Sequence, residues 1–339
     1  MTAPGRSLHA APVLQRHVKY GVTTVVAEAS RLAILAESVP GTPVTARWPW
    51  LAASVVKPAA DEQPWMVGVT AGDRLVAAAV LLDVPGTLCR TTLAGTAEGH
   101  RGALLAVDET AATELGIALA DALLGAPRDF TLGPVGQSPA LASLLRELPI
   151  GLTIEHQPVP VVSAGHPNGI GMSHGVERTL RKARNRMKAD GLEWAIDVTG
   201  EGPEITTALP LLESICRDRD HAGGRLSPLD QPDRRRLWHR RVLALAASGR
   251  LRLATLRLDG QLAAYVLGIE DGRSYRVLEG RYVDRWARYS PGRVLEAAML
   301  ERALEGASFD VFDWMTAVAP ETLLAANDLD PLVVVRGRI

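Results

Sequence analysis

A helix start near the C-terminal end of the chain carries the residues with the clearest chemical meaning. Ser290, Pro291 and Gly292 directly follow a predicted strand and its loop, and they open a predicted amphipathic helix. Serine caps helices well, proline suits the first helical position, and glycine lets another molecule approach the backbone closely. The unpaired N–H groups and the dipole of such a helix end favour an anion. The pattern indicates a cradle for a phosphate group, or else an ordinary capped helix.

The elements around this helix follow from residue spacing and turn signals. The turn at Asp259-Gly260 joins a strand at Leu251–Leu258 to a returning strand at Gln261–Ile269, and Ser274–Gly280 adds a third strand. Such short connections predict an antiparallel meander. Phe309–Trp314 is the predicted strand after the helix. A strand, a crossover helix and another strand give a parallel pair.

The first half of the chain repeats this order of elements. Strands are predicted at Trp65–Val69, Leu75–Asp83 and Thr87–Leu93, followed by a helix at Asp108–Leu124 and a strand at Phe130–Leu132. An internal duplication is the simplest explanation. The first copy lacks the Ser-Pro-Gly helix start.

Length and composition limit the class of protein. The chain has 339 residues, enough for two domains, and is 47% hydrophobic with a formal net charge of −1. This charge excludes a strongly electrostatic partner that acts on the whole molecule. Cys89 and Cys216 match no metal or redox spacing, so we expect no metal site and a reducing, cytoplasmic location. No stretch approaches the length of a membrane span.

We predict three parts along the chain. Residues 1–20 form a flexible arm, 21–165 a first lobe and 166–339 a second lobe, with a Gly-, Pro- and Ser-rich linker at 163–173. A strongly basic helix is predicted at Glu177–Asp190 after the linker. Basic runs on helices are most often solvated faces, and binding of nucleic acid or an anionic substrate is the alternative.

Three segments of the second half resemble the GNAT superfamily of N-acyltransferases. They are the basic helix at 178–191, the strand pair at 253–264, and the Tyr289–Gly292 helix start with the strand Phe309–Trp314. More narrowly, the chain resembles the tandem-domain branch of CelD-like acetyltransferases and Fem-type peptidyl transferases. The family often has an acidic residue and a lysine after the last strand, whereas residues 315–322 contain no lysine.

The resemblance implies an α/β fold of the α+β kind. Two GNAT-like lobes are expected, each with a mixed, mainly antiparallel sheet, a splayed parallel pair of strands and flanking helices. The donor substrate is expected to be acetyl-CoA or another acyl-CoA, with its pantetheine arm between the splayed strands. The pyrophosphate is expected over the N–H groups at the helix start, near an arginine. The predicted donor-binding residues are Val277, Leu278, Arg288, Ser290, Pro291, Gly292, Arg293, Val294 and Leu295.

Within this framework three residues are predicted to be catalytic. Glu279 and Asp313 end the two splayed strands, where a carboxylate serves as a general base. Their alternative roles are a solvated strand end for Glu279 and a turn cap for Asp313. Tyr289 is placed to protonate the leaving thiolate, with a packed loop aromatic as the alternative.

The acceptor site is predicted from polar residues near the same strands. Tyr282 and Asp284 follow the third meander strand, and His221 lies in what reads as a polar, Gly-rich loop. An ordinary surface loop is the alternative for His221. The first lobe, without the helix start, is expected to wall the acceptor cleft.

The leading hypothesis is an acyl-CoA-dependent N-acyltransferase that acts on an amine of a small molecule, sugar or peptide. One alternative is a Fem-type transferase with an aminoacyl-tRNA donor, in which the basic helix contacts tRNA phosphates. The net charge near zero argues mildly against it. The other alternative is a non-catalytic ligand-binding protein, because fold alone does not separate these functions.

Overall fold

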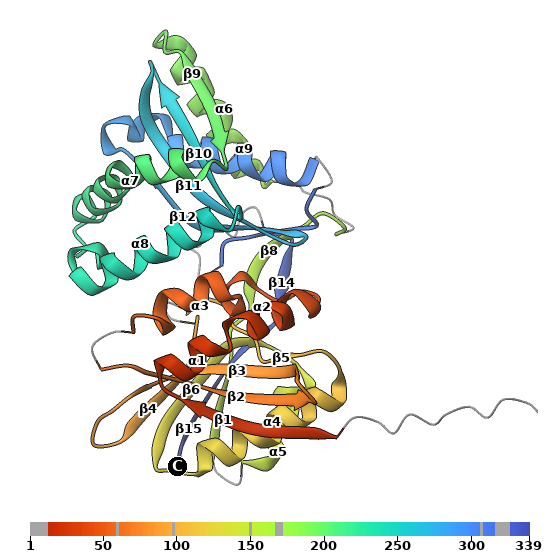
Figure 1. The fold of residues 1–339 in the computed structure, drawn as a ribbon. Coiled ribbons are helices and arrows are strands. Elements are labelled where there is room, and N and C mark those ends of the chain that lie inside the picture. The colour runs from red at the N-terminus through yellow and green to blue at the C-terminus, as the bar shows by residue number, and fades with distance from the viewer. Residues whose placement is uncertain are drawn as a thin grey trace, which may run out of the picture.

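The protein consists of two stacked lobes, each built on one β-sheet (Figure 1). The computed structural model describes residues 13–58, 61–96, 99–148, 151–166, 172–305, 308–315 and 326–339. Both sheets are mainly antiparallel and contain one parallel pair. The predicted fold class is therefore confirmed.

The first lobe contains an eight-stranded sheet in the order β1-β2-β3-β4-β6-β15-β7, with β5 paired to β3. Only the β4–β6 pair is parallel among these strands. The strands are β1 (Leu14–Tyr20), β2 (Gln63–Ala71), β3 (Arg74–Val84), β4 (Cys89–Leu93), β5 (Leu105–Ala106), β6 (Arg128–Gly136), β7 (Leu152–His156) and β15 (Leu332–Arg338). The helices are α1 (Val22–Ala27), α2 (Ala29–Ser38), α3 (Trp48–Val55), α4 (Glu109–Leu124) and α5 (Pro139–Glu147), with a 3-10 turn η1 (Val44–Ala46).

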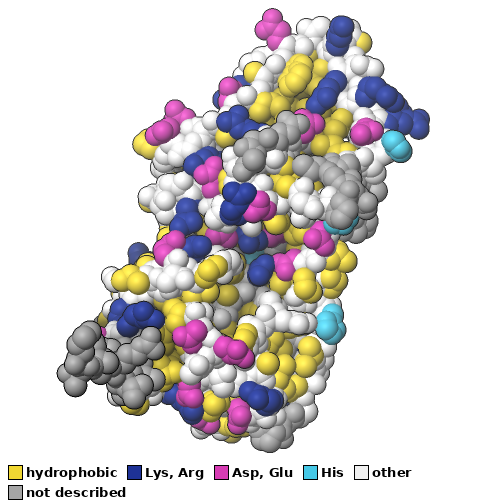
Figure 2. Space-filling view, turned by 90° about the vertical axis from the view of Figure 1, so that its right-hand side faces the viewer, with side chains coloured by type: hydrophobic (Ala, Val, Ile, Leu, Met, Phe, Trp, Pro, Cys, Tyr) yellow, Lys and Arg dark blue, Asp and Glu magenta, His cyan; other side chains and the backbone are white. Residues whose placement is uncertain are grey.

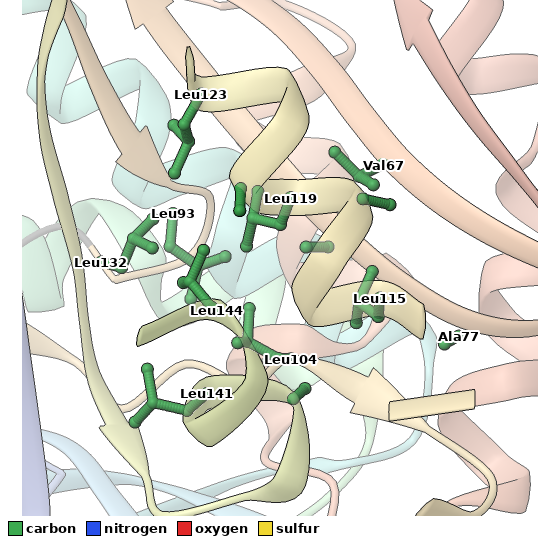
Figure 3. Close-up of a cluster of buried hydrophobic side chains, with 14 of the residues drawn as sticks. Val67, Ala77, Leu93, Leu104, Leu115, Leu119, Leu123, Leu132, Leu141 and Leu144 are labelled. Atoms are coloured by element: carbon green, nitrogen blue, oxygen red, sulfur yellow. The ribbon is translucent and has the colours of Figure 1, made fainter. Parts of the chain in front are cut away.

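Helix α4 anchors the core on one face of this sheet. Leu115, Leu119 and Leu123 recur every fourth residue, so they share one helix face and point into the core (Figure 3). Burying each leucine contributes about 1.5–3 kcal/mol. Helices α1 to α3 pack on the opposite face of the sheet.

The second lobe contains a seven-stranded sheet in the order β14-β8-β13-β12-β11-β10-β9. The strands are β8 (Val159–Ser163), β9 (Trp194–Thr199), β10 (Leu251–Leu258), β11 (Gln261–Asp271), β12 (Ser274–Tyr282), β13 (Val311–Asp313) and β14 (Asp328–Asp330). The helices are α6 (His174–Ala189), α7 (Gly202–Ala222), α8 (Pro232–Ala247) and α9 (Pro291–Glu305), with the 3-10 turns η3 (Pro228–Asp230) and η4 (Asp284–Tyr289). Helices α6 and α9 cover one face, and α7 and α8 the other.

The predicted meander and parallel pair both form. Strands β10, β11 and β12 are antiparallel neighbours, and β12 runs parallel to β13. The first lobe repeats this arrangement in β2, β3, β4, α4 and β6. Strand β13 is shorter than predicted, since it begins at Val311 rather than at Phe309.

The two lobes exchange strands, which the sequence did not indicate. Strand β7 lies in the first sheet and β8 in the second, with only two residues between them. Strand β14 lies in the second sheet and β15 in the first, with only Pro331 between them. The N–H of Gln157 donates to the carbonyl of Leu332 at 2.8 Å and joins the two crossings. The chain therefore crosses between the lobes before residue 165 and again near its end. The sequence did not indicate these crossings, because periodicity does not reveal which sheet a strand joins.

The segment Leu14–Tyr20 also differs from its predicted role. It forms β1, paired along seven residues with β2, where the sequence suggested part of a flexible arm. Residues 1–12 of that arm lie outside the described residues. Pro4, Gly5 and Pro12 favoured a flexible arm in the sequence. The residues from Leu14 to Tyr20 instead form a strand, because their backbone pairs with β2 at the edge of the sheet.

A buried ion network joins the lobes. The Asp271 carboxylate accepts hydrogen bonds from the Val44 N–H at 2.8 Å and Arg47 Nε at 3.1 Å in the first lobe, and from Arg276 Nε at 2.8 Å in the second. Arg276 also pairs with Asp313. No more than a tenth of any of these four charged side chains is exposed. Figure 2 shows further Lys, Arg, Asp and Glu side chains intermingled across the junction between the lobes.

We predict that Asp271→Asn destabilises the protein by about 3–5 kcal/mol, because an amide nitrogen cannot accept from these donors and leaves buried arginine charge uncompensated. Chemical denaturation measures this loss. Asp310→Asn is the control, since Asp310 and Arg273 form an exposed ion pair and the change should have little effect. Equal stability of the two variants would contradict a structural role for the network.

Candidate functional site

The parallel strands of the second lobe separate after three residue pairs. Their register is Ser274 with Val311, Tyr275 with Phe312 and Arg276 with Asp313. The buried Arg276–Asp313 ion pair is therefore the last contact before the strands diverge. Strand β12 continues to Tyr282, and in the described part of the chain no strand pairs with that edge beyond Arg276.

A β-bulge distorts β12 at this edge. Leu267 pairs with Glu279 and Gly268 with Val277, so Leu278 is the extra residue. Gly268 is required beside the bulge, because a Cβ there would lie 1.8 Å from the Tyr275 hydroxyl. The bulge redirects the strand just before Glu279.

Helix α9 begins beside the end of β12. A Cβ on Gly292 would lie 3.4 Å from the Tyr282 ring, which places the first turn next to the open edge. Ser290 has a left-handed backbone (φ 49°), and its carbonyl accepts the N–H of Val294 at 3.1 Å. The prediction that the Val294 N–H is free is thus wrong, and the open helix end is formed by Gly292 and Arg293.

The predicted residues Val294 and Leu295 anchor the helix instead. Their side chains are 1% and 0% exposed in the core of the second lobe, so they hold the first turn in place. The first turn of α9 contains no acidic side chain. An anion at this helix end meets the helix dipole without repulsion from a carboxylate in the first turn.

The matching helix start in the first lobe has the opposite chemistry. Asp108 precedes α4 and its side chain accepts the N–H of Ala111 at 2.8 Å, while Glu109 occupies the first turn. The Asp108 carboxylate takes up an N–H group to which an anion would bind, and the negative charge of Glu109 would repel the anion. The two lobes share a topology but not an anion site.

The loop before α9 is held by α6. Asp190 Oδ2 accepts hydrogen bonds from Arg288 Nη2 at 2.6 Å and from the Tyr289 hydroxyl at 2.7 Å. The hydrogen bond from Tyr289 raises the pKa of that tyrosine. Arg186 donates to the Arg288 carbonyl at 2.8 Å. The Tyr289 hydroxyl therefore donates a hydrogen bond to Asp190, an arrangement that supports the packed loop role rather than the catalytic one.

A cavity of about 320 Å³, here called the junction cavity, lies where the lobes meet. Helices α7 and α8, the turn η3 and β12 contribute to it from the second lobe, and His100 from the first. The bulge residue Leu278 lines it as well. Its polar wall contains His100, Arg234, Trp238, Arg241, Glu279 and Arg281.

Glu279, predicted from the sequence, lines this cavity in a fixed orientation. Trp238 Nε1 donates to Glu279 Oε2 at 3.2 Å, and the Tyr265 hydroxyl donates to Oε1. Burial raises the pKa of Tyr265 well above its ordinary value, and nearby Glu279 adds to this effect, so the hydroxyl stays a donor. Burial also raises the pKa of Cys216 in the same wall to about 12, so its thiol is a poor nucleophile.

Asp313 does not join Glu279 in the cavity. Its carboxylate is 3% exposed, pairs with Arg276 and accepts the N–H of Met315 at 2.7 Å. This arrangement supports a structural role at the point where the strands separate. A general base needs an oxygen that reaches substrate, and Asp313 is absent from the lining of the junction cavity.

The predicted acceptor residues are dispersed. His221 lies in the last turn of α7, not in a loop, and bonds Asp230 through Nε2 at 2.7 Å. The guanidinium of Arg219 lies 4.5 Å from the centre of the Tyr282 ring, and Asp284 is an exposed side chain 3.9 Å from the same arginine. None of the three predicted residues lines the junction cavity.

Sequence reasoning missed the arginines and the tryptophan of this wall. Arg234, Trp238 and Arg241 lie in a second basic run, and basic runs on helices are most often solvated faces. The signal was present, since residues 234, 238 and 241 share one face of a helix. Arg281 carried no signal beyond its position two residues after Glu279.

No group of three or more His, Cys, Asp and Glu side chains is arranged to hold a metal ion in the described ranges. Among the helices that the structure describes, none combines the length and the apolar character needed to cross a membrane.

The comparisons with known proteins agree with this architecture. Residues 175–321 match the family model described as an acetyltransferase (GNAT) domain. Comparison with curated proteins finds no match.

Solved structures share the fold across nearly the whole chain. FemX superposes with a TM-score of 0.63 at 11% identity, covering 92% of this chain and 96% of its own. The C-terminal domain of a putative lysylphosphatidylglycerol synthetase from Agrobacterium fabrum superposes with a TM-score of 0.56 at 13% identity, covering 92% of both chains. A protein of unknown function from Bacteroides thetaiotaomicron gives 0.57 at 11% identity, covering 95% of this chain and all of its own. At these identities the likeness concerns the fold. The predicted resemblance to the GNAT superfamily is confirmed over residues 175–321, and FemX shares the fold.

We predict that Tyr265→Phe lowers the free energy of unfolding by about 1–3 kcal/mol, because it removes a buried donor shared by Glu279 and the Leu212 carbonyl. Tyr20→Phe is the matched control, as Tyr20 is 60% exposed. Denaturant titration of both variants measures the difference. A Tyr265→Phe variant as stable as the control would show that this hydroxyl does not hold Glu279.

Proposed function

We propose that this chain, whose residues 175–321 match the GNAT acetyltransferase domain, is an acyl-CoA-dependent N-acyltransferase. The observation that carries the proposal is the divergence of β12 from β13 after Arg276 and Asp313, with the start of α9 beside the open edge. Such a slot fits a thioester on a long amide-containing arm that ends in phosphates. The strand edge offers backbone groups to the amides, and the helix end offers N–H groups to the phosphates.

The donor site in this proposal uses backbone more than side chains. The β12 edge at Val277 and Leu278 pairs with the arm, and the N–H groups of Gly292 and Arg293 meet the pyrophosphate. The side chain of Arg293 adds positive charge. Arg288 contributes less, because Asp190 already neutralises it. The acidic start of α4 supports donor binding in the second lobe alone.

The reaction forms a C–N bond between the acceptor amine and the acyl carbon and breaks the C–S bond of the thioester. One proton leaves the amine nitrogen, and the departing thiolate gains one. Glu279 lines both the redirected end of β12 and the junction cavity, so we assign it as the base that takes the amine proton. The hydrogen bonds from Trp238 and Tyr265 hold its carboxylate toward the amine.

One feature favours an aminoacyl-tRNA as an alternative donor. Helix α6 buries Val176, Leu180, Ala183 and Met187 and exposes a basic face. Its last turn also holds the loop before α9, so this face flanks the proposed phosphate site. A basic face beside a donor site suits a longer phosphate backbone. The exposed cations are Arg178, Arg181, Lys182, Arg184, Arg186 and Lys188.

We predict that acetyl-CoA or a longer acyl-CoA raises the melting temperature and that Gly292→Glu abolishes this shift, because a carboxylate then occupies the anion site. Gly202→Glu is the matched control, since it places the same side chain in the first turn of α7. Thermal-shift measurements across acyl-CoAs test both variants. Salt-sensitive binding of aminoacyl-tRNA without any response to CoA thioesters would favour the alternative donor.

We predict that Glu279→Gln lowers the rate of amine acylation by about 10²–10⁴-fold, because the amide cannot accept the proton. The thermal shift by acyl-CoA should persist, since Glu279 does not bind the donor in this proposal. Glu193→Gln, an exposed residue of the same lobe, serves as the control. Mass detection of acylated amines measures the rate. Unchanged acylation by Glu279→Gln would remove Glu279 from the chemistry, and donor binding without acylation of any amine would favour a ligand-binding protein.

A further inference from the structure

The junction cavity is lined by more arginines than carboxylates. Arg234, Arg241 and Arg281 line it, and Glu279 is the acidic residue in its wall. In the hydrogen bonds described above, the two Glu279 oxygens accept from Trp238 and Tyr265 rather than from these arginines. A concave site with this surplus attracts an anionic ligand.

Arg281 is a partly buried arginine of this wall. Its Nη1 donates to the neighbouring Gly280 carbonyl, and Asp220 lies 3.8 Å from Nη2. Burial lowers the pKa of Arg281, but the nearby Glu279 carboxylate and other acidic groups raise it overall. Its Nε is buried and has no hydrogen-bond partner within the described residues. A buried donor of a charged group left unpaired costs stability. The Arg281 side chain as a whole is 30% exposed and lines the cavity, so a carboxylate or phosphate oxygen there meets its other guanidinium nitrogens.

The position of Arg281 relative to Glu279 sets the kind of ligand. The two residues are separated by one residue in a regularly paired part of β12, so their side chains lie on the same face of the strand. Their Cα atoms are therefore roughly 7 Å apart. At this spacing, one small molecule spans both residues, with its amine at Glu279 and its anionic group at Arg281.

Helix α8 extends the same chemistry across the junction. Arg234, Leu237 and Arg241 are spaced by three and four residues and share one helix face. Arg241 lines both the junction cavity and a cavity of about 430 Å³ that reaches β4 and β6 of the first lobe. The guanidinium of Arg241 lies 4.6 Å from the centre of the Trp50 ring, so α3 of the first lobe holds it in place.

Arg234 connects the junction cavity to the surface. It also lines an outer groove of about 930 Å³ between α3 and α8. Arg235, Arg236, Arg240 and Lys57 lie along that groove, against the carboxylates of Glu62, Glu213 and Asp233. Arginine side chains therefore line the path of an anionic ligand from the outer groove to Glu279.

We propose that the acceptor is an amine that also carries an anionic group, a carboxylate or a phosphate, which Arg281 binds while the amine meets Glu279. This inference rests on the proposed acyl transfer and names its substrate class. Arginine suits the role because its planar donors bind carboxylates and phosphates bidentately. The first lobe takes part through His100, which lines the cavity, and through Trp50, which packs against Arg241.

Titration calorimetry with matched amines tests the proposal on the full chain. The pairs are glycine and glycinamide, phosphoethanolamine and ethanolamine, and glucosamine 6-phosphate and glucosamine. We expect the anionic member of at least one pair to bind at least about 10-fold more tightly, and Arg281→Gln to weaken that binding by about 10- to 100-fold. Arg281→Lys should recover part of it, and Arg257→Gln, an exposed arginine of β10, should leave it unchanged.

Three results would overturn the proposal: equal binding of charged and neutral members, no binding of any anionic member at millimolar concentration, or an equal loss in Arg281→Gln and Arg257→Gln. Acylation of the same amines is measured separately. Acylation of neutral and anionic amines at equal rates would sink this inference and leave acyl transfer intact. Anion-dependent binding that Arg281→Gln removes, without acylation, would sink acyl transfer and leave the ligand class intact.

Discussion

Asp271 ends strand β11 with its carboxylate buried, and donors from both lobes converge on it. Arg47 and the Val44 N–H come from the first lobe, and Arg276, which also binds Asp313, comes from the second. A buried ion network of this kind adds little net stability compared with apolar packing, but removing one member is costly. Its role here is geometric, because it fixes the lobes relative to one another and holds β12 and β13 together at their last residue pair.

The strand exchange reinforces this geometry. The parallel strand of each lobe has an antiparallel neighbour contributed by the other half of the chain: β8 for β13 and β15 for β6. The two crossings lie side by side and are joined by the hydrogen bond from Gln157 to Leu332. Rotation of one lobe against the other would therefore break sheet hydrogen bonds. The junction cavity, which needs residues from both lobes, is consequently a preformed site.

Much of the second lobe could be predicted because its signals are local. The Asp259-Gly260 turn fixed the hairpin, the Ser-Pro-Gly start fixed α9, and the position of Glu279 at the end of an alternating run placed it near the slot. Helix α7 was missed although Ile205, Leu209, Leu212, Ile215 and Cys216 form a helical stripe. Pro210 interrupts that pattern in the sequence, and the buried face outweighs the hydrogen bond that proline removes. Strand exchange and the role of Arg281 depend on partners far along the chain, which spacing does not encode.

The first lobe kept the topology of the second and changed its chemistry at one helix start. Asp108 and Glu109 place carboxylates at the positive end of the α4 dipole, whereas the first turn of α9 has no acidic side chain. The first lobe instead contributes Trp50 and His100 to the junction, where Trp50 packs against Arg241 of the second lobe. This explains how a chain with a net charge of −1 contains a strongly basic cavity. Overall charge describes the averaged field around a protein, whereas a ligand in a cleft responds to the few charges that the fold collects there.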